Sequence, residues 1–205
     1  DFLDSPWYPL YFLDFETFTS PIPLYDGTKP YQKIPFQYSI HYLEKEGSNL
    51  KHHAFLAVPN TDPRKEIAVN LIQQIPKNAC VIVYNIGFEK SVLNSLKAWF
   101  PEYEDNIDGI INNLHDLMIP FKNQHFYSWQ MKGSYSIKAV LPVLVPELSY
   151  EGMEISDGDM AMLAYKKMCE STDPSEIEGI RKALLEYCKL DTLGMVRILE
   201  ALKNF

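Results

Sequence analysis

The chain has 205 residues, enough for one sizeable domain that buries a core of its own. Apolar residues make up 46% and charged residues 22%, and no apolar run approaches the roughly 20 residues that span a bilayer, which argues against a membrane protein. The formal net charge of −8 disfavours a broad basic surface for nucleic acid, but it leaves room for a small acidic site where divalent ions supply positive charge.

The predicted elements run from strands early in the chain to helices later. Apolar runs and alternating β-favouring residues predict strands at residues 10–17, 36–45, 50–58, 79–85 and 114–118. Apolar spacing of three and four residues predicts helices at residues 64–75, 88–100, 136–144, 157–168 and 175–203. This pattern predicts an α/β domain over residues 1–205, with a central mixed β-sheet flanked by α-helices.

Cysteine usage favours a reducing, cytoplasmic location. Cys80, Cys169 and Cys188 are few and show no metal-ligand spacing, so we expect small buried hydrophobes. The first residues lack the basic start and apolar core of a signal peptide. A start at Asp1, without Met, is compatible with a domain excised from a longer protein, whose further domains would then be partners.

The first predicted strand carries two acids where apolar residues surround them. Asp14 and Glu16 lie two residues apart and therefore point to the same face of a strand. Like charges held side by side repel, and a buried ion is unfavourable unless it is paired or coordinated. A divalent cation removes both penalties. The alternative is an edge strand whose acidic face is solvated.

The last predicted helix carries an acid on its apolar stripe. Asp191 falls between Cys188 and Met195 at helical spacing, and Tyr187 precedes it by one turn on the same face. A buried acid needs a partner, and the Tyr187 hydroxyl is available to orient water. The alternative is a structural tyrosine beside a capped or ion-paired aspartate.

A third acid follows the predicted strand at residues 79–85. The chain turns through Gly87 and opens a helix at Phe88 and Glu89. Residues at the carboxyl end of a strand in an α/β sheet point into the crevice where ligands usually bind. Glu89 is equally explained as a favourable charge in the first turn of a helix.

Together, the three motifs resemble the DEDD superfamily of 3′→5′ exonucleases, in its tyrosine subclass, on a ribonuclease H-like fold. They read Asp14–Phe–Glu16, Asn85–Ile–Gly–Phe–Glu89 and Tyr187–Cys–Lys–Leu–Asp191. The second motif departs from the family, which usually has Asp where this chain has Glu89. Asp116 is similar to an extra aspartate that often follows the second motif. Residues 133–148 further resemble the DUF2779 domain family.

The resemblance implies an enzyme, a metal-dependent exonuclease that releases nucleoside 5′-monophosphates from nucleic acid with a free 3′ end. It implies two ions, Mg²⁺ or Mn²⁺, held roughly 3.5–4 Å apart. Asp14 would bridge them, Glu16 and Asp191 would complete the first site, and Glu89 would hold the second. Tyr187 would orient the attacking water.

Aromatic side chains are candidates for holding the terminal base. Phe15, Phe18, Tyr127 or Trp129 could stack on it, but with 13% aromatic residues the favoured interpretation is that most of them serve as core or surface.

Three other functions remain open from the sequence. The first is a catalytically degenerate ribonuclease H-like domain that binds nucleic acid or a protein partner. The second is an endonuclease on the same fold, although Tyr187 four residues before Asp191 is not part of that pattern. The third is an interaction module with a chance acidic cluster.

Overall fold

The computed structural model describes residues 2–204 and contains a five-stranded sheet in the order β3-β2-β1-β4-β5. The strands are β1 (Leu10–Phe18), β2 (Ile34–Leu43), β3 (Lys51–Leu56), β4 (Cys80–Val83) and β5 (Leu114–Asp116). The first three strands pair antiparallel, whereas β4 and β5 run parallel to β1. The predicted α/β class with a central mixed sheet is confirmed, and this architecture is compatible with a ribonuclease H-like fold.

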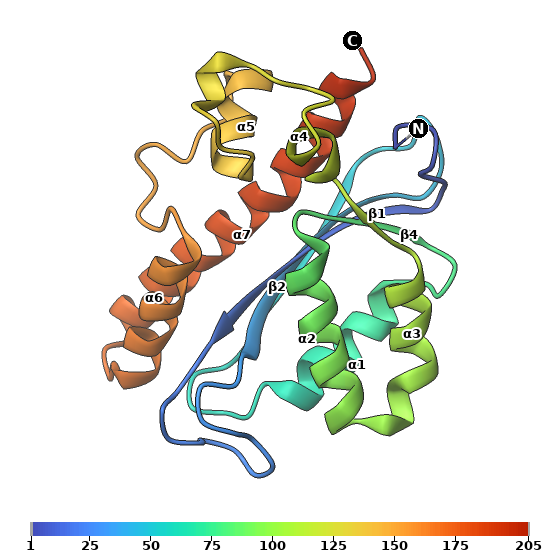
Figure 1. Ribbon diagram of the computed structural model, residues 1–205. Coiled ribbons are helices and arrows are strands. Elements are labelled where there is room, and N and C mark those ends of the chain that lie inside the picture. Colours follow the sequence, from blue (N-terminus) through green and yellow to red (C-terminus); the bar gives the residue numbers. More distant parts are fainter. Residues whose placement is uncertain (1, 205) are drawn as a thin grey trace.

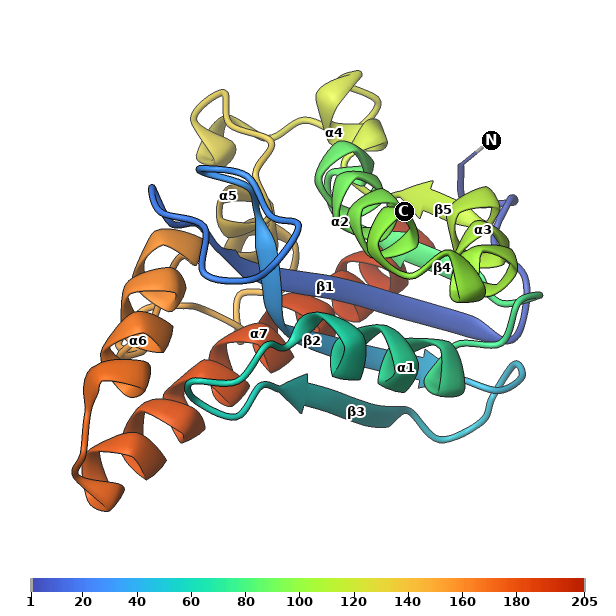
Figure 2. The same ribbon diagram turned by 90° about the horizontal axis from the view of Figure 1, so that it is seen from below.

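Helices cover both faces of the sheet. They are α1 (Arg64–Gln74), α2 (Ile86–Trp99), α3 (Glu104–Asn112), α4 (Ile119–Lys122), α5 (Ile137–Leu144), α6 (Gly158–Glu170) and α7 (Pro174–Leu202), with short 3₁₀ turns at Pro101–Tyr103 and Trp129–Met131. Figure 1 shows α7 on one side of the strands and α1, α2 and α3 on the other. In Figure 2, α1 lies over the strands and α7 passes behind them.

The predicted strands and helices are all present, but α3 and α4 were not predicted. The α3 segment reads EDNIDGIIN, and its polar residues and Gly109 hide the helical spacing. Packing of Ile107 and Ile110 into the core stabilises this helix, which is tertiary information. No helix in the described part of the chain is long and apolar enough to cross a membrane.

Contacts with β2 fix the position of α7 across the sheet. Asp173 caps the first turn by accepting from the Ser175 amide at 2.9 Å. Further along, the Gln37 side chain donates to the Leu184 carbonyl at 2.8 Å. The Thr192 hydroxyl lies 2.8 Å from Ser39 Oγ and 2.7 Å from His41 Nδ1. These buried polar contacts set which residues of α7 face β1.

Candidate metal centre

Three carboxylates meet between β1 and α7. One oxygen atom each from Asp14, Glu16 and Asp191 lies within 4.8 Å of the other two. Asp14 and Glu16 share a face of β1, and the buried stripe of α7 carries Asp191 to that face. The Cys188 thiol lies 3.5 Å from Asp14 Oδ2, although 174 residues separate the two in sequence. The long helix therefore packs directly on the acidic part of β1.

Glu89 approaches these acids from α2, on the other side of the sheet (Figure 1). β1 pairs with β4 only over Leu10–Phe12, so the edge of β1 beyond Phe12 is open on that side. There the backbone of Phe15 is close enough to the Glu89 carboxylate to limit the rise in its pKa. Glu89 Oε2 is buried and has no hydrogen-bond partner among residues 2–204. Glu89 lies outside the tight group of three but close enough to repel Glu16.

Burial raises the pKa of all four acids. Burial and then repulsion from Asp191 raise the pKa of Glu16 to about 8. Burial raises the pKa of Asp191 to about 6, and hydrogen bonds from tyrosine hydroxyls limit that rise. Burial and neighbouring carboxylates hold the pKa values of Asp14 and Glu89 well above their usual range. The charged form of this cluster is therefore unfavourable near neutral pH unless a cation accompanies it.

Tyr150 holds Asp191 through a direct hydrogen bond. The hydroxyl of Tyr150 donates to Asp191 Oδ1 at 2.6 Å, and both residues are buried. Tyr187 lies beside the pair, and its hydroxyl also limits the rise in the pKa of Asp191. The two rings lie 6.2 Å apart. The sequence predicted Tyr187 as the residue that orients water, but it missed Tyr150, which lies in an irregular segment without periodicity.

Lys138 and Asp157 are further charged neighbours that the sequence analysis missed. Lys138 lies in the first turn of α5, and its positive charge lowers the pKa of Glu16 and of Asp191. A signal for it existed, because it is the one charged residue in the apolar helix IKAVLPVL. Asp157 caps α6 by accepting from the Met160 amide and adds repulsion on Glu16.

Asp116 serves the turn that presents Glu89. Its carboxylate accepts hydrogen bonds from the backbone amides of Asn85, Ile86 and Met118, at 3.0 to 3.1 Å. Asn85 adopts a left-handed backbone with φ of 82° at the start of α2. Because the carboxylate satisfies otherwise unpaired amides at this helix start, Asp116 orients the first turn of α2.

The aromatic candidates divide into core and surface. The prediction that Phe15 and Phe18 could stack on a base is wrong, because both are buried in the core. Phe15 packs edge-on against Tyr38 on β2, and Phe18 packs on Tyr165 of α6. Tyr127 and Trp129 are 61% and 78% exposed and remain available.

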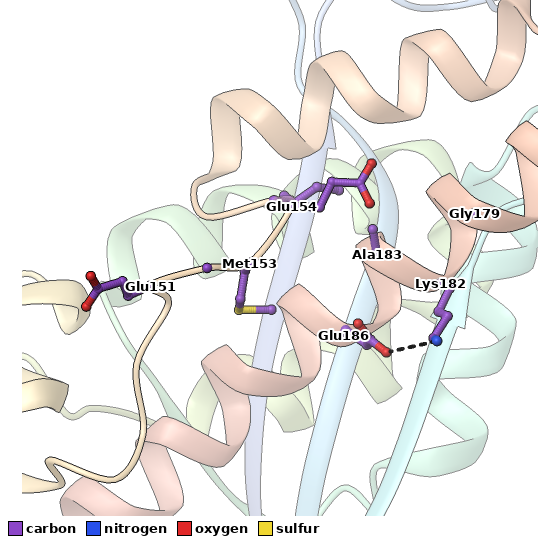
Figure 3. Close-up of a pocket in the computed structure, with 9 residues that line it drawn as sticks. Glu151, Met153, Glu154, Gly179, Lys182, Ala183 and Glu186 are labelled. Atoms are coloured by element: carbon purple, nitrogen blue, oxygen red, sulfur yellow. Dashed lines mark ion pairs between the residues drawn. The ribbon is translucent and has the colours of Figure 1, made fainter.

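A pocket lies beside α7, and none of the four acids of the cluster lines it. It is lined by the segment from Glu151 to Ile155 and by α7 residues up to Glu186. Figure 3 shows Glu151, Glu154 and Glu186 around it, with Lys182 paired to Glu186 at 3.9 Å. The pocket lining carries three glutamates and a single lysine, which is already paired with Glu186. This negative charge makes the pocket a poor site for phosphate.

The donor set of the cluster fits a hard divalent cation. All four side chains offer carboxylate oxygens, which suit Mg²⁺ or Mn²⁺ better than a nitrogen- and sulfur-binding ion such as Zn²⁺. Glu89 Oε2, at the edge of the cluster, is a buried acceptor without a hydrogen-bond partner among the described residues. The residues present therefore fit the ions that the resemblance implies, and their role as ligands stays a prediction.

Comparisons with known proteins give a family and three relatives. A family model described as a domain of unknown function (DUF2779) matches residues 11–136. The chain is 27% identical to the uncharacterized protein MG366 homolog of Mycoplasma pneumoniae, over 95% of this chain and 32% of that protein. It is 26% identical to uncharacterized protein MG366 of Mycoplasma genitalium, over 91% and 31%. It is 27% identical to uncharacterized protein UU173 of Ureaplasma parvum, over 91% and 30%. The chain thus spans about a third of the length of the curated relatives it matches.

Proposed function

The chain belongs to the DUF2779 family, and we propose that this domain is a metal-dependent 3′→5′ exonuclease of the tyrosine DEDD type. The observation that carries the proposal is the gathering of Asp14, Glu16 and Asp191 within 4.8 Å. Three acids from two segments that lie far apart in the chain, each acid with a raised pKa, are unfavourable to assemble without a cationic ligand. Such clusters are typical of two-metal phosphodiester hydrolysis.

The chain's own residues would hold the ions and position the reacting groups. Two Mg²⁺ or Mn²⁺ ions, when bound, would supply an activated water and charge stabilisation at the departing 3′ oxygen. Asp14, Glu16 and Asp191 would hold them, with Glu89 at the second position. Tyr150 would fix the carboxylate of Asp191, because it donates a short hydrogen bond to Oδ1. Tyr187, one turn before Asp191 on α7, would orient the water.

The substrate we propose is nucleic acid with a free 3′ end, and the products are nucleoside 5′-monophosphates. Exposed Tyr127 and Trp129 offer faces on which a terminal base could stack. Further domains of a longer chain would be additional partners, in keeping with the larger size of the relatives. We place the activity in the cytoplasm, because the three cysteines are free and a reducing compartment keeps thiols in that form.

Digestion of 5′-labelled single strands of DNA and of RNA with Mn²⁺ tests this function. We expect a ladder that shortens from the 3′ end, that chelation of the metal stops, and that Asp14→Ala abolishes. The exposed Asp4→Ala is the matched control and should leave the ladder unchanged. Cleavage of circular DNA would indicate an endonuclease, and absence of any ladder with both polymers and both ions would refute the proposal.

One observation favours a second candidate, a catalytically degenerate domain that binds nucleic acid or a protein partner. Glu89 replaces the usual Asp and stands outside the group of three acids. If this residue no longer holds the second ion, binding would persist without hydrolysis. Retention of a labelled strand in a gel shift, with no ladder under the conditions of the digestion, would support this alternative.

A further inference from the structure

Lys138 places a positive charge beside the acidic cluster without forming an ion pair. Its Nζ lies 5.6 Å from the ring centre of Tyr150, which hydrogen-bonds Asp191, and 5.4 Å from the ring centre of Tyr187. Its charge acts on Glu16 and Asp191, since it lowers the pKa of both. Within residues 2–204, no hydrogen bond or ion pair joins the ammonium to any of these acids.

This arrangement differs from that of a structural lysine. A lysine that only neutralises an acidic cluster is expected to bond a carboxylate directly, as Lys97 does with Asp108 at 2.7 Å. Contact with the tyrosine faces holds the charge in place through the ring electrons and leaves the three N–H donors unused. The side chain is partly buried at the start of α5, and its ammonium lies over the two tyrosine rings beside the cluster.

Charge balance indicates which ligand those donors suit. Four ionised carboxylates balance two divalent ions, so the charge of Lys138 is left for an anion bound at the same place. A phosphoryl group held over the carboxylates is such an anion, and an ammonium donates well to its oxygens.

We propose that Lys138 is a phosphate-contacting residue, whose ammonium donates to a non-bridging oxygen of the phosphoryl group bound at the Asp14–Glu16–Asp191 cluster. The proposal rests on the proposed function and adds to it the residue that recognises the phosphate. Tyr150 then has two tasks, because its hydroxyl holds Asp191 and its ring face, together with that of Tyr187, holds Lys138.

Binding of nucleoside 5′-monophosphates tests the proposal without relying on catalysis. Calorimetry with AMP and with dTMP, at saturating Mn²⁺, would compare wild type, Lys138→Gln, Lys138→Arg and the control Lys189→Gln. Lys189 is exposed on α7 and acts on His41 and His52 rather than on the carboxylates. Loss of a charged hydrogen bond predicts affinity about tenfold to a hundredfold weaker for Lys138→Gln. Lys138→Arg should recover part of it, and Lys189→Gln should match wild type.

Each outcome decides the matter. Weaker monophosphate binding by Lys138→Gln, with Mn²⁺ affinity and melting temperature unchanged, supports the proposal even if no strand is ever degraded. Equal binding by wild type and Lys138→Gln overturns it, as does a wild type that binds neither monophosphate. Parallel loss of Mn²⁺ binding by Lys138→Gln also overturns it, because the lysine would then act on the carboxylates alone. If the wild type degrades strands and Lys138→Gln binds the monophosphates equally well, the proposed function stands but Lys138 has no part in it.

Discussion

Tyr150 donates a 2.6 Å hydrogen bond to Asp191 Oδ1, joining an irregular segment to the middle of the longest helix. This bond holds one carboxylate oxygen of the buried acid. Partners of this kind fix the orientation of a metal ligand, and their loss weakens metal binding by about 10- to 100-fold. Tyr150 therefore lets the cluster be tested without removing any of its charges.

Tyr150→Phe is expected to weaken Mn²⁺ binding by about tenfold. The substitution removes the hydroxyl and keeps the ring that packs near Tyr187. Mn²⁺ titration calorimetry measures the change. Tyr103→Phe removes a hydroxyl in the turn before α3, remote from Asp191 along the chain, and should bind Mn²⁺ like wild type. Unchanged affinity in Tyr150→Phe would show that α7 alone orients Asp191.

Asp14→Asn should stabilise the metal-free protein and at the same time abolish metal-induced stabilisation. Removing one buried charge relieves repulsion with Glu16, Glu89 and Asp191. We expect a gain of about 1–3 kcal/mol in the free energy of unfolding in EDTA, measured by urea denaturation. Adding Mn²⁺ should then stabilise wild type but not the variant. The exposed Asp4→Asn is the control, and an Asp14→Asn protein that is less stable in EDTA would contradict this prediction.

Stability without metal should fall as pH rises. The folded pKa of Glu16 is raised from 4.5 to about 8, so folding favours its protonated form. Its stabilising contribution is present in full below about pH 4.5 and is lost progressively up to about pH 8, a loss of about 3 kcal/mol by pH 7 if Glu16 acts alone. Urea denaturation in EDTA from pH 5 to 8 measures the slope. Saturating Mg²⁺ should flatten this dependence of stability on pH. A flat profile in EDTA would mean that burial does not raise the pKa of these acids.

Glu89→Gln should change metal stoichiometry rather than fold. Glu89 Oε2 is buried without a partner, so an amide of similar size fits the same space with little effect on stability. We expect two Mn²⁺ ions per wild-type chain and one per variant, by calorimetry or by electron paramagnetic resonance. Glu89→Asp, which restores the usual family residue, should keep both ions. Two ions bound to Glu89→Gln would remove Glu89 from the ligand set.

Local periodicity accounts for the parts of the site that could be predicted from the sequence. Alternation along β1 places Asp14 and Glu16 on one face, and helical spacing places Asp191 on the buried stripe of α7. Both follow from backbone geometry and need no knowledge of neighbouring elements. The same argument predicted all five strands and the longer helices around the site, except α3.

The parts that could not be predicted depend on contacts between distant segments. Lys138 gave a local signal as a lone charge in an apolar helix, but its target depends on how α5 packs against α7. Tyr150 gave no signal, because nothing in an irregular segment specifies where a side chain points. The assignment of Phe15 and Phe18 as stacking residues failed for a related reason, since exposure depends on what covers each face of β1.

By itself, the sequence determined the order of strands and helices and the faces on which the acids lie, because hydrogen-bonded backbones repeat every two residues or every 3.6. The tertiary structure alone decided that Asp14 and Asp191 meet, that Glu89 stands beside them, and that Tyr150 and Lys138 complete the surroundings. The physical reason is that the crossing of α7 over β1 is set by buried contacts such as Gln37 with Leu184 and Ser39 with Thr192, which join segments far apart in the chain.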